Sequence, residues 1–426
     1  MTHEQSKGAQ GKAPAPAKRD HASKHERAAA PQPKPKAPPK PKKPEPKPAI
    51  GPMRSGAVAL IGRANVGKST LLNAALGENL AIVSPTPQTT RDTLLGVAHR
   101  GNAELRMLDT PGLHKPKTEL GRVMNHFARE AARAADVVVF VVDVAAKGAP
   151  RGAPHPGDLT LLQSFKEAAA EHGSSAQPIV LVLNKIDLVR DKGALLPLID
   201  AFSKVLEFKA IVPIAARRDG EAERVMDVVA DLLPEGPWQF DADDLTDRPT
   251  RYFAAEYLRE QILRATRLEV PHAAAVTIER FSEAGDGPVE IDLLIHVERP
   301  GQKKILIGKG GETLKRIGTA ARLRIKELLG RKVILKTWVR VTPAWRANAE
   351  RLAEMGYQKK AADEGATFLL SLPDEEMPGV GDVLDETPEN EGDLDDEGAG
   401  DEGSLDGDED DLDALDEDED DEEQEQ

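Results

Sequence analysis

The sequence of 426 residues contains no cysteine, which excludes disulfide bonds and thiolate metal sites. This absence indicates the reducing cytosol as the compartment. No run of 18 apolar residues is present, so we expect no membrane-spanning helix. The N-terminus lacks the apolar core of a secretory signal peptide, so no such signal is expected.

Large apolar side chains are also scarce at the N-terminal end, where the charge is positive. Residues 1–53 carry 12 Lys and Arg against 4 Asp and Glu, and they are rich in proline and alanine. Such a segment cannot build a core, so we expect disorder or polyproline II structure. It is either a solvated tether or a weak electrostatic handle for RNA or acidic lipid.

The C-terminal end lacks positive charge. Residues 374–426 contain 29 Asp and Glu and no Lys or Arg. A low-complexity acidic segment of this kind repels itself and extends, so we predict an extension over 358–426 with a disordered acidic tail. The tail either keeps the protein soluble or competes with RNA for the mildly basic middle of the chain, and the sequence leaves both alternatives open.

A phosphate-binding motif begins the middle of the chain. Residues 57–61 predict a buried strand, and residues 70–76 have helical composition. Between them lies Gly62-Arg-Ala-Asn-Val-Gly-Lys-Ser69, a P-loop in the strand–loop–helix context that this motif requires. Its glycines let backbone N–H groups point at phosphate oxygens. Lys68 is expected to reach the β- and γ-phosphates and the Ser69 hydroxyl to bind Mg²⁺, whereas the alternative is a Gly-rich turn before a helix.

A second motif follows an expected pair of strands at residues 93–98 and 104–109. The second strand ends in Asp109-Thr-Pro-Gly112, where Asp109 can hold Mg²⁺, usually through water, and the Gly112 amide can contact a γ-phosphate. The next residue is Leu113, where many GTPases carry a glutamine. A leucine cannot orient an attacking water, so we predict slow intrinsic turnover unless another group supplies positive charge.

One such group is suggested within the P-loop. We hypothesise that the side-chain oxygen of Asn65 helps to hold a K⁺ ion near the bridge between the β- and γ-phosphates, in the role of an arginine finger. The alternative is that Asn65 only shapes the loop. Equal GTPase rates in K⁺ and Na⁺ buffers would reject the hypothesis.

A third motif indicates guanine. Continuous apolar runs at residues 136–143 and 178–183 predict central parallel strands, and the second delivers Asn184-Lys-Ile-Asp187. The Asp187 carboxylate can accept both the ring N–H and the exocyclic amine of guanine. Adenine would leave that carboxylate unpaired, which disfavours a metabolic P-loop kinase.

The remaining contacts to the base come from neighbouring loops. The stem of Lys185 can lie on the base, and Asn184 can tie loops together. Residues 209–216 predict a last strand whose following turn presents the Ala216 amide to the guanine oxygen, and residues 225–233 predict an amphipathic closing helix. Ligands at the carboxyl ends of strands are typical of doubly wound folds.

A second folded unit is predicted after a linker rich in Pro, Gly and Asp. Gly308-Lys-Gly-Gly311 lies between an Ile-rich segment and a basic helix, which is the pattern of the KH-domain loop that clamps a nucleic-acid backbone. The expected elements are a helix at 251–267, strands at 273–281 and 289–297, a helix at 312–329 and a basic strand at 332–341.

The predicted RNA contacts surround this loop. The glycines allow close approach of the backbone, and Lys309 adds charge beside a helix N-terminus. Ile305 and Ile307 are expected to line an apolar groove for bases. The alternative is that the cations form an ordinary solvated face. The predicted RNA-binding residues are Ile307, Gly308, Lys309, Gly310, Gly311, Lys315 and Arg316.

Together these residues resemble the Era family of bacterial GTPases. The resemblance covers about residues 54–357 and implies a Ras-like P-loop GTPase domain at 54–235, a linker at 236–249 and an α+β type II KH domain at 250–357. The segments that carry it are Gly62–Ser69, Gln88-Thr-Thr-Arg91, Asp109-Thr-Pro-Gly-Leu-His114, Asn184–Asp187, Glu269-Val-Pro-His272 and Ile307–Gly318.

The resemblance also implies ligands and partners. These are GTP or GDP with Mg²⁺, the 3′ end of 16S ribosomal RNA, a role in maturation of the small (30S) subunit, and peripheral association with the inner face of the cytoplasmic membrane. We expect a monomer. By position Thr90 would be the switch threonine that binds Mg²⁺, although the residues alone do not choose between Thr89 and Thr90. The family usually has Ser-Ala where this chain has Ala215-Ala216.

Two functions remain open at this point: a GTP-hydrolysing switch that acts on ribosomal RNA, and an RNA-binding protein whose nucleotide is only structural. The predicted catalytic residues are Asn65, Lys68, Thr90 and Gly112, and the predicted Mg²⁺ ligands are Ser69, Thr90 and Asp109. The predicted nucleotide-binding residues are Gly62, Arg63, Ala64, Asn65, Val66, Gly67, Lys68, Ser69, Asp109, Thr110, Pro111, Gly112, Asn184, Lys185, Asp187 and Ala216.

Overall fold

The computed structural model describes residues 51–149, 152–172, 177–283, 285 and 287–357. The predictions for the basic N-terminal arm and for the extension over 358–426 therefore lie outside the described residues.

The first half of the chain forms a six-stranded sheet in the order β2-β3-β1-β4-β5-β6. The strands are parallel except at the β2–β3 pair, which is antiparallel. β4 and β5 are central and buried along nearly their whole length, as their continuous apolar runs predict. The strands are β1 (Arg54–Ile61), β2 (Leu94–Arg100), β3 (Ala103–Asp109), β4 (Val137–Asp143), β5 (Ile179–Asn184) and β6 (Ala210–Pro213).

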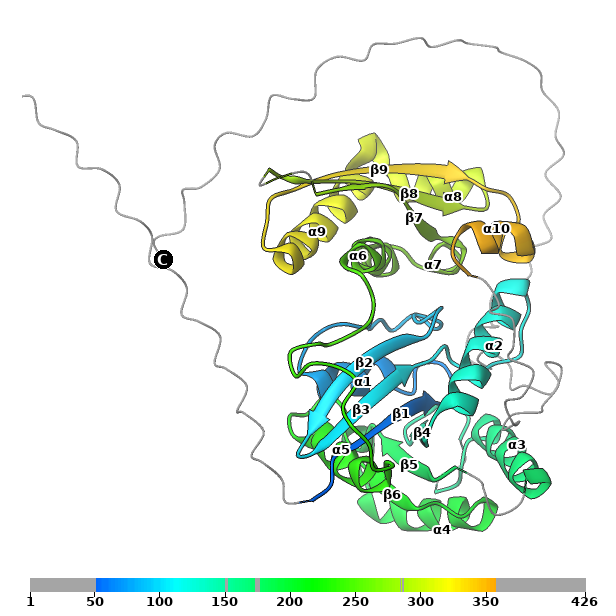
Figure 1. Ribbon diagram of the computed structural model, residues 1–426. Helices are drawn as coiled ribbons and strands as arrows, with labels where there is room; N and C mark the ends of the chain where they lie inside the picture. Colours follow the sequence, from blue (N-terminus) through cyan, green and yellow to red (C-terminus); the bar gives the residue numbers. More distant parts are fainter. Residues whose placement is uncertain (1–50, 150–151, 173–176, 284, 286, 358–426) are drawn as a thin grey trace, which may run out of the picture. The chain divides into compact units, whose positions relative to one another are not determined.

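Helices cover both faces of this sheet (Figure 1). Side chains of β1 alternate between two apolar clusters: Val58 and Leu60 pack with α1 and α5, whereas Ala59 and Ile61 pack with α2, α3 and α4. This double cover is the predicted doubly wound architecture. The helices are α1 (Lys68–Leu76), α2 (Glu119–Ala134), α3 (Pro156–His172), α4 (Leu195–Val205) and α5 (Glu221–Leu232).

The second half forms a three-stranded sheet in the order β7-β8-β9, with β7 antiparallel and β9 parallel to the central β8. Alternate residues of β8 pack against Leu306 of α8 and Ile317 of α9, while the isoleucines before Gly308 end α8. The predicted fold class is thereby confirmed. The elements are α6 (Thr250–Ala265), α7 (Val270–Ala273), β7 (Ala275–Ser282), β8 (Val289–Val297), α8 (Pro300–Ile307), α9 (Glu312–Leu329), β9 (Val333–Val341) and α10 (Ala349–Glu354).

The predicted linker has no helix or strand, but it is fastened to the first sheet. Glu104, buried in β3, accepts backbone N–H bonds from Gln239 and Phe240, each at 2.8 Å. On the outer edge of β2, the Val97 amide donates to the Leu245 carbonyl at 2.9 Å. The linker is therefore a bound strap and not a free tether. The boundaries at 236 and 249 stay predictions.

Candidate functional site

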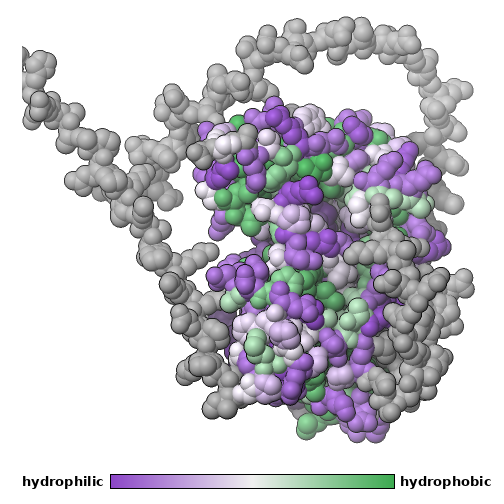
Figure 2. Space-filling model, viewed as in Figure 1, coloured by the Kyte–Doolittle hydropathy of each residue, from purple (hydrophilic) through white to green (hydrophobic). Residues whose placement is uncertain are grey.

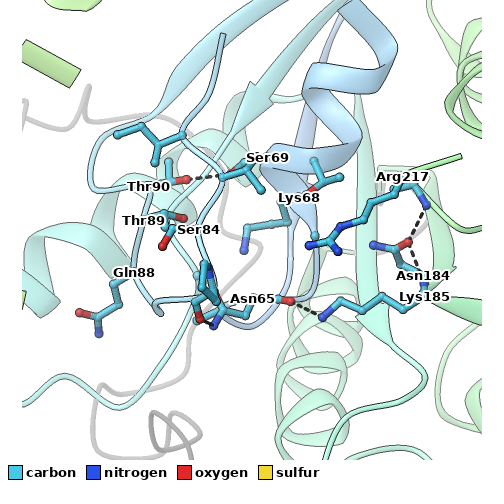
Figure 3. A pocket seen from close by; sticks show the side chains of 18 of the residues that line it. Asn65, Lys68, Ser69, Ser84, Gln88, Thr89, Thr90, Asn184, Lys185 and Arg217 are labelled. Atoms are coloured by element: carbon cyan, nitrogen blue, oxygen red, sulfur yellow. Dashed lines mark hydrogen bonds between the residues drawn. The ribbon is translucent and has the colours of Figure 1, made fainter. Parts of the chain in front are cut away.

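The glycine-rich loop between β1 and α1 encloses one end of a cavity of about 340 Å³ (Figure 3). Gly62 has φ +147°, and a Cβ there would lie 2.3 Å from the Val141 carbonyl oxygen. Gly67 has φ +106°, and its Cβ would lie 2.2 Å from Asn184 Nδ2. Only glycine fits either position, because both space and backbone conformation exclude a side chain.

Most of the predicted nucleotide-binding residues line this cavity, although they come from five separate segments. Gly62, Arg63, Val66, Asp109 and Pro111 lie behind the lining. The predicted residues on the lining are Ala64, Asn65, Gly67, Lys68, Ser69, Thr90, Thr110, Gly112, Asn184, Lys185, Asp187 and Ala216, and the segment before β2 adds Ile82, Val83, Ser84, Pro85, Gln88 and Thr89.

Lys68 is the buried cation of the cavity. Its side chain extends into the space that the loop encloses (Figure 3), and its Nζ donates to the carbonyls of Gly62 at 3.1 Å and Arg63 at 2.9 Å. Burial lowers the pKa of Lys68 to about 8, partly offset by the charge of Asp109. An anion in the cavity would restore the missing counter-charge.

Three oxygen groups predicted to bind Mg²⁺ meet behind Lys68. Ser69 Oγ and Thr90 Oγ1 donate to the same oxygen of Asp109, at 2.6 and 3.0 Å, and they lie 3.0 Å apart. Burial raises the pKa of Asp109, while Lys68 and the two hydroxyls oppose that shift.

The oxygen atoms of Ser69, Thr90 and Asp109 suit a Mg²⁺ ion. The other carboxylate oxygen of Asp109 is buried and has no hydrogen-bond partner among the residues that the structure describes. Hard oxygen donors suit Mg²⁺, which usually keeps water between itself and part of the protein. The structure brings Thr90 into this group and not Thr89, whose carbonyl accepts a bond from Arg259.

At the other end of the cavity, Asn184 joins three loops. Its Nδ2 donates to the Val66 carbonyl at 2.8 Å, and its Oδ1 accepts from the amides of Lys185 and Ala216 at 2.8 and 3.0 Å. Asn184 therefore connects loops through its side chain, as the sequence predicts. A guanine oxygen would share the Ala216 amide with Asn184, and this contact stays a prediction. Asp187 is exposed and lines the cavity.

Two other predicted residues are engaged by the protein itself. Arg63 pairs with the buried Asp158 at the start of α3, with Nε 2.8 Å from Oδ1, so only its backbone faces Lys68. Asn65 has φ +61°, and its Nδ2 donates to the Pro85 carbonyl at 2.9 Å. That bond matches the loop-shaping alternative for Asn65, while K⁺ at its oxygen stays a prediction.

The residues after Gly112 do not supply a side chain that could orient water. Leu113 is 1% exposed and packs in the apolar cluster with α2 and α3. The ring of His114 bridges two segments, with Nδ1 2.8 Å from the Gly112 carbonyl oxygen and Nε2 3.1 Å from the Gln88 amide nitrogen. Because a carbonyl only accepts, Nδ1 carries the proton and Nε2 accepts from Gln88. The prediction of slow turnover keeps its structural basis.

The second glycine loop, between α8 and α9, is open. Gly310 and Gly311 have φ +61° and +83°, and no atom lies within 4 Å of a Cβ built on either. Lys309, Lys315 and Arg316 are exposed beside them. Of the two predicted wall residues, Ile305 is 50% exposed, whereas Ile307 is partly buried against the core. Ile305 is therefore the more available apolar contact.

The sequence reading missed further apolar surface on this half. Figure 2 shows green apolar residues among purple hydrophilic ones on the face in view. On β9, Ile334 and Trp338 face away from the helices and are 39% and 48% exposed. Their period-two spacing was the available signal. Leu323 and Leu328 of α9 are also exposed.

Comparisons with known proteins agree with both halves. A family model described as a 50S ribosome-binding GTPase matches residues 57–185, and a KH-domain model matches residues 269–346. GTPase Era of Geotalea uraniireducens is 44% identical over 305 residues, which is 72% of this chain and 98% of that relative. GTPase Era of Ruminiclostridium cellulolyticum is 41% identical with the same coverage.

Two solved structures are similar over the same region. One is a variant of Era from Aquifex aeolicus bound to GDP and AlF4⁻, and the other is Era in complex with MgGDPNP and nucleotides 1506–1542 of 16S ribosomal RNA. Each is 38% identical, has a TM-score of 0.64, and matches 72% of this chain and 99% of its own.

Proposed function

This chain belongs to the Era family of GTPases, and from that premise we propose that guanine nucleotide in its first half controls how its second half binds the 3′ end of 16S ribosomal RNA. Such a switch would serve maturation of the 30S subunit. The observation that carries the proposal is the convergence of Ser69, Thr90 and Asp109 beside Lys68, in one chain with an open KH loop.

The first half has the groups that a GTPase needs. Loop amides and Lys68 would bind the phosphates, and Ser69, Thr90 and Asp109 would hold Mg²⁺. When bound, this ion neutralises charge on the β- and γ-phosphate oxygens. Family membership favours hydrolysis over the alternative in which nucleotide is only structural. Phosphate release measured with and without small subunits separates these two functions.

Guanine specificity is proposed to rest on Asp187. In an Asp187→Asn variant the side chain no longer accepts from the exocyclic amine, so we expect GDP affinity to fall by about 100-fold. Xanthosine diphosphate offers a carbonyl at that position, and the Asn amide can donate to it. Titration with GDP, ADP and xanthosine diphosphate tests this, and a wild-type chain that prefers ADP or binds none of them would contradict the proposed function.

The second half is proposed to bind single-stranded RNA at Gly308–Gly311. The exposed cations Lys304, Lys309, Lys315 and Arg316 form no ion pair with a carboxylate among the residues that the structure describes. Unpaired cations beside a glycine loop suit a phosphate backbone, and exposed apolar side chains suit bases. Binding of an oligoribonucleotide that copies the 3′ end of 16S RNA tests the assignment, with a scrambled oligoribonucleotide as control.

Three finer proposals accompany this function. They are a K⁺ ion near Asn65, a monomeric state, and peripheral association with the inner face of the membrane. No helix within the described parts of the chain is long and apolar enough to cross a membrane. GTPase rates in K⁺ and Na⁺ buffers, light scattering and flotation with anionic vesicles test the three in turn.

A further inference from the structure

The segment Gln88-Thr-Thr-Arg91 binds a different part of the protein through each of its four residues. Gln88 contacts His114 in the loop after β3, and the Thr89 carbonyl accepts from Arg259 of α6 at 2.5 Å. Thr90 joins Ser69 and Asp109 at the proposed Mg²⁺ site. The fourth residue, Arg91, reaches the second half of the chain.

Arg91 is 5% exposed and is held by backbone carbonyls around α7. Its Nη1 donates to the Ala274 carbonyl at 2.6 Å, and its Nη2 donates to those of Pro271 at 3.0 Å and His272 at 3.2 Å. The guanidinium carbon lies 5.8 Å from the ring centre of the fully buried Trp345. Moving this buried cation away from its acceptors costs free energy, because no water is present to replace the lost hydrogen bonds.

Arg259 of α6 also binds this segment. It is 2% exposed, and a bidentate pair with Glu256 at 2.8 and 2.6 Å orients its guanidinium. One arm of that guanidinium holds the Thr89 carbonyl. The second half thus holds the residues on both sides of Thr90: Arg259 binds the Thr89 carbonyl, and the carbonyls at 271–274 bind the side chain of Arg91.

Because Thr90 and Arg91 are neighbours in the chain, a movement of one residue must move the other. Consecutive Cα atoms are about 3.8 Å apart, so Thr90 cannot move far from Asp109 without moving Arg91. Of the three carbonyls that hold Arg91, two belong to α7 and the third to Ala274, which directly precedes β7. The first residue of β7, Ala275, is paired with His296 of β8. Movement of Arg91 therefore acts on the sheet that carries the RNA-binding elements.

We propose that Arg91 is the positioning residue that couples the two sites: its anchorage at 271–274 holds Thr90 at the Mg²⁺ site, and release of Thr90 loosens that anchorage. This inference rests on the proposed function. GTP, which needs Thr90, stabilises the anchored state, and GDP does not require it. Because coupling is reciprocal, RNA that favours the anchored state raises the affinity for GTP by the same factor.

The test compares Arg91→Met, which removes the cation and keeps a long stem, with Arg91→Lys. In the full chain with Mg²⁺, we expect Arg91→Met to weaken binding of a non-hydrolysable GTP analogue by about 5-fold or more, while GDP affinity changes by less than about 2-fold. The ratio of RNA affinities in the two nucleotide states should fall toward one. Arg91→Lys, which can reach fewer carbonyls, should lie between the wild type and Arg91→Met.

Arg331→Met is the matched control. Arg331, like Arg91, donates to backbone carbonyls, those of Gly285 at 2.5 Å and Gly287 at 2.7 Å, but it follows the end of α9 that is far from Gly308–Gly311, so both ratios should stay at wild-type values. A wild-type chain without RNA binding or without a nucleotide effect would overturn the proposed function itself. A nucleotide effect that persists unchanged in Arg91→Met overturns only this inference and leaves the apolar contact of α2 with Trp345 as the route. If Arg91→Met does not unfold cooperatively, Arg91→Lys decides by the same ratios.

Discussion

The two glycine loops of this chain are alike in sequence context and opposite in surroundings. Each ends at the first turn of a helix, α1 or α9. In Gly62–Ser69, neighbouring protein atoms fill the space where side chains of Gly62 and Gly67 would lie. In Gly308–Gly311, the last two glycines face open space, so only their positive φ disfavours a side chain there.

The difference shows two ways in which surroundings can constrain a glycine loop. The first loop is fixed by its own protein, since Asn184 and Val141 determine its path, and it suits one small ligand held in one geometry. In the second, protein atoms crowd only Gly308, while Gly310 and Gly311 leave room for a polymer that passes across them. The sequence motif is similar in both, so the surroundings distinguish the proposed nucleotide site from the proposed RNA site.

The largest effect should come from crowding the first loop. In Gly67→Ala the new methyl would meet Asn184 Nδ2 in a backbone conformation that disfavours alanine. We expect GDP affinity to fall by about 100-fold or more, because the amides that face phosphate must shift. Gly311→Ala is the matched variant and should keep GDP affinity at the wild-type level. Equal losses in both would show that the comparison is wrong.

Charge should matter more in the second loop. Neutralising Lys309, Lys315 and Arg316 to Gln should weaken RNA binding about 10- to 100-fold and reduce the salt dependence of log K by up to about 2 units. GDP binding should not change. Lys204→Gln on α4, an exposed cation paired with Asp200, is the control. An unchanged salt slope in the triple variant would remove this loop from the RNA site.

Gly308 sharpens the comparison because it is crowded within the open loop. Its Cβ would lie 2.2 Å from Thr313 Oγ1 at φ +73°. We expect Gly308→Ala to destabilise the chain by about 1–3 kcal/mol, with part of the loss recovered by Thr313→Ala. Thermal unfolding of the single and double variants measures this. No recovery would mean that backbone strain alone sets the cost.

The smallest effect concerns protons. Burial holds the pKa of Lys68 near 8 in the folded, nucleotide-free chain, below its ordinary value of 10.5. The unfolded chain binds more protons between these values, so stability should rise with pH across that window. Phosphate raises the pKa again, and GDP binding near pH 8.5 should take up a fraction of one proton. Calorimetry in two buffers of different ionisation enthalpy detects this uptake, and buffer-independent heats would contradict it.

Much of the first sheet and its site could be predicted from local signals. Apolar runs predicted β1, β4 and β5, and the motifs at the ends of strands predicted which segments line the cavity. Parallel strands bring their carboxyl ends together, so the sequence alone predicts that Lys68, Asp109 and Asn184 lie close together.

What escaped prediction depends on backbone carbonyls and distant partners. The sequence could not show that the Thr90 hydroxyl lies beside Ser69 and Asp109, or that Arg259, 170 residues away from Thr89, binds the Thr89 carbonyl. Nothing in the composition of residues 236–249 shows that Glu104 binds them. The burial of Arg91 could not be predicted either, because a sequence motif specifies residue types and not the backbone carbonyls that their side chains contact.

The strap along β2 has one more consequence. An outermost strand with unpaired amides invites another chain to add to it, and aggregation often starts there. Here Leu245 takes one of those amides on β2, while the opposite border of the sheet ends at Pro213, which has no N–H to offer. The linker at 236–249 therefore also protects the edge strand β2 from pairing with another molecule of this protein. Shortening the linker would expose the edge of β2 even where the nucleotide and the RNA still bind.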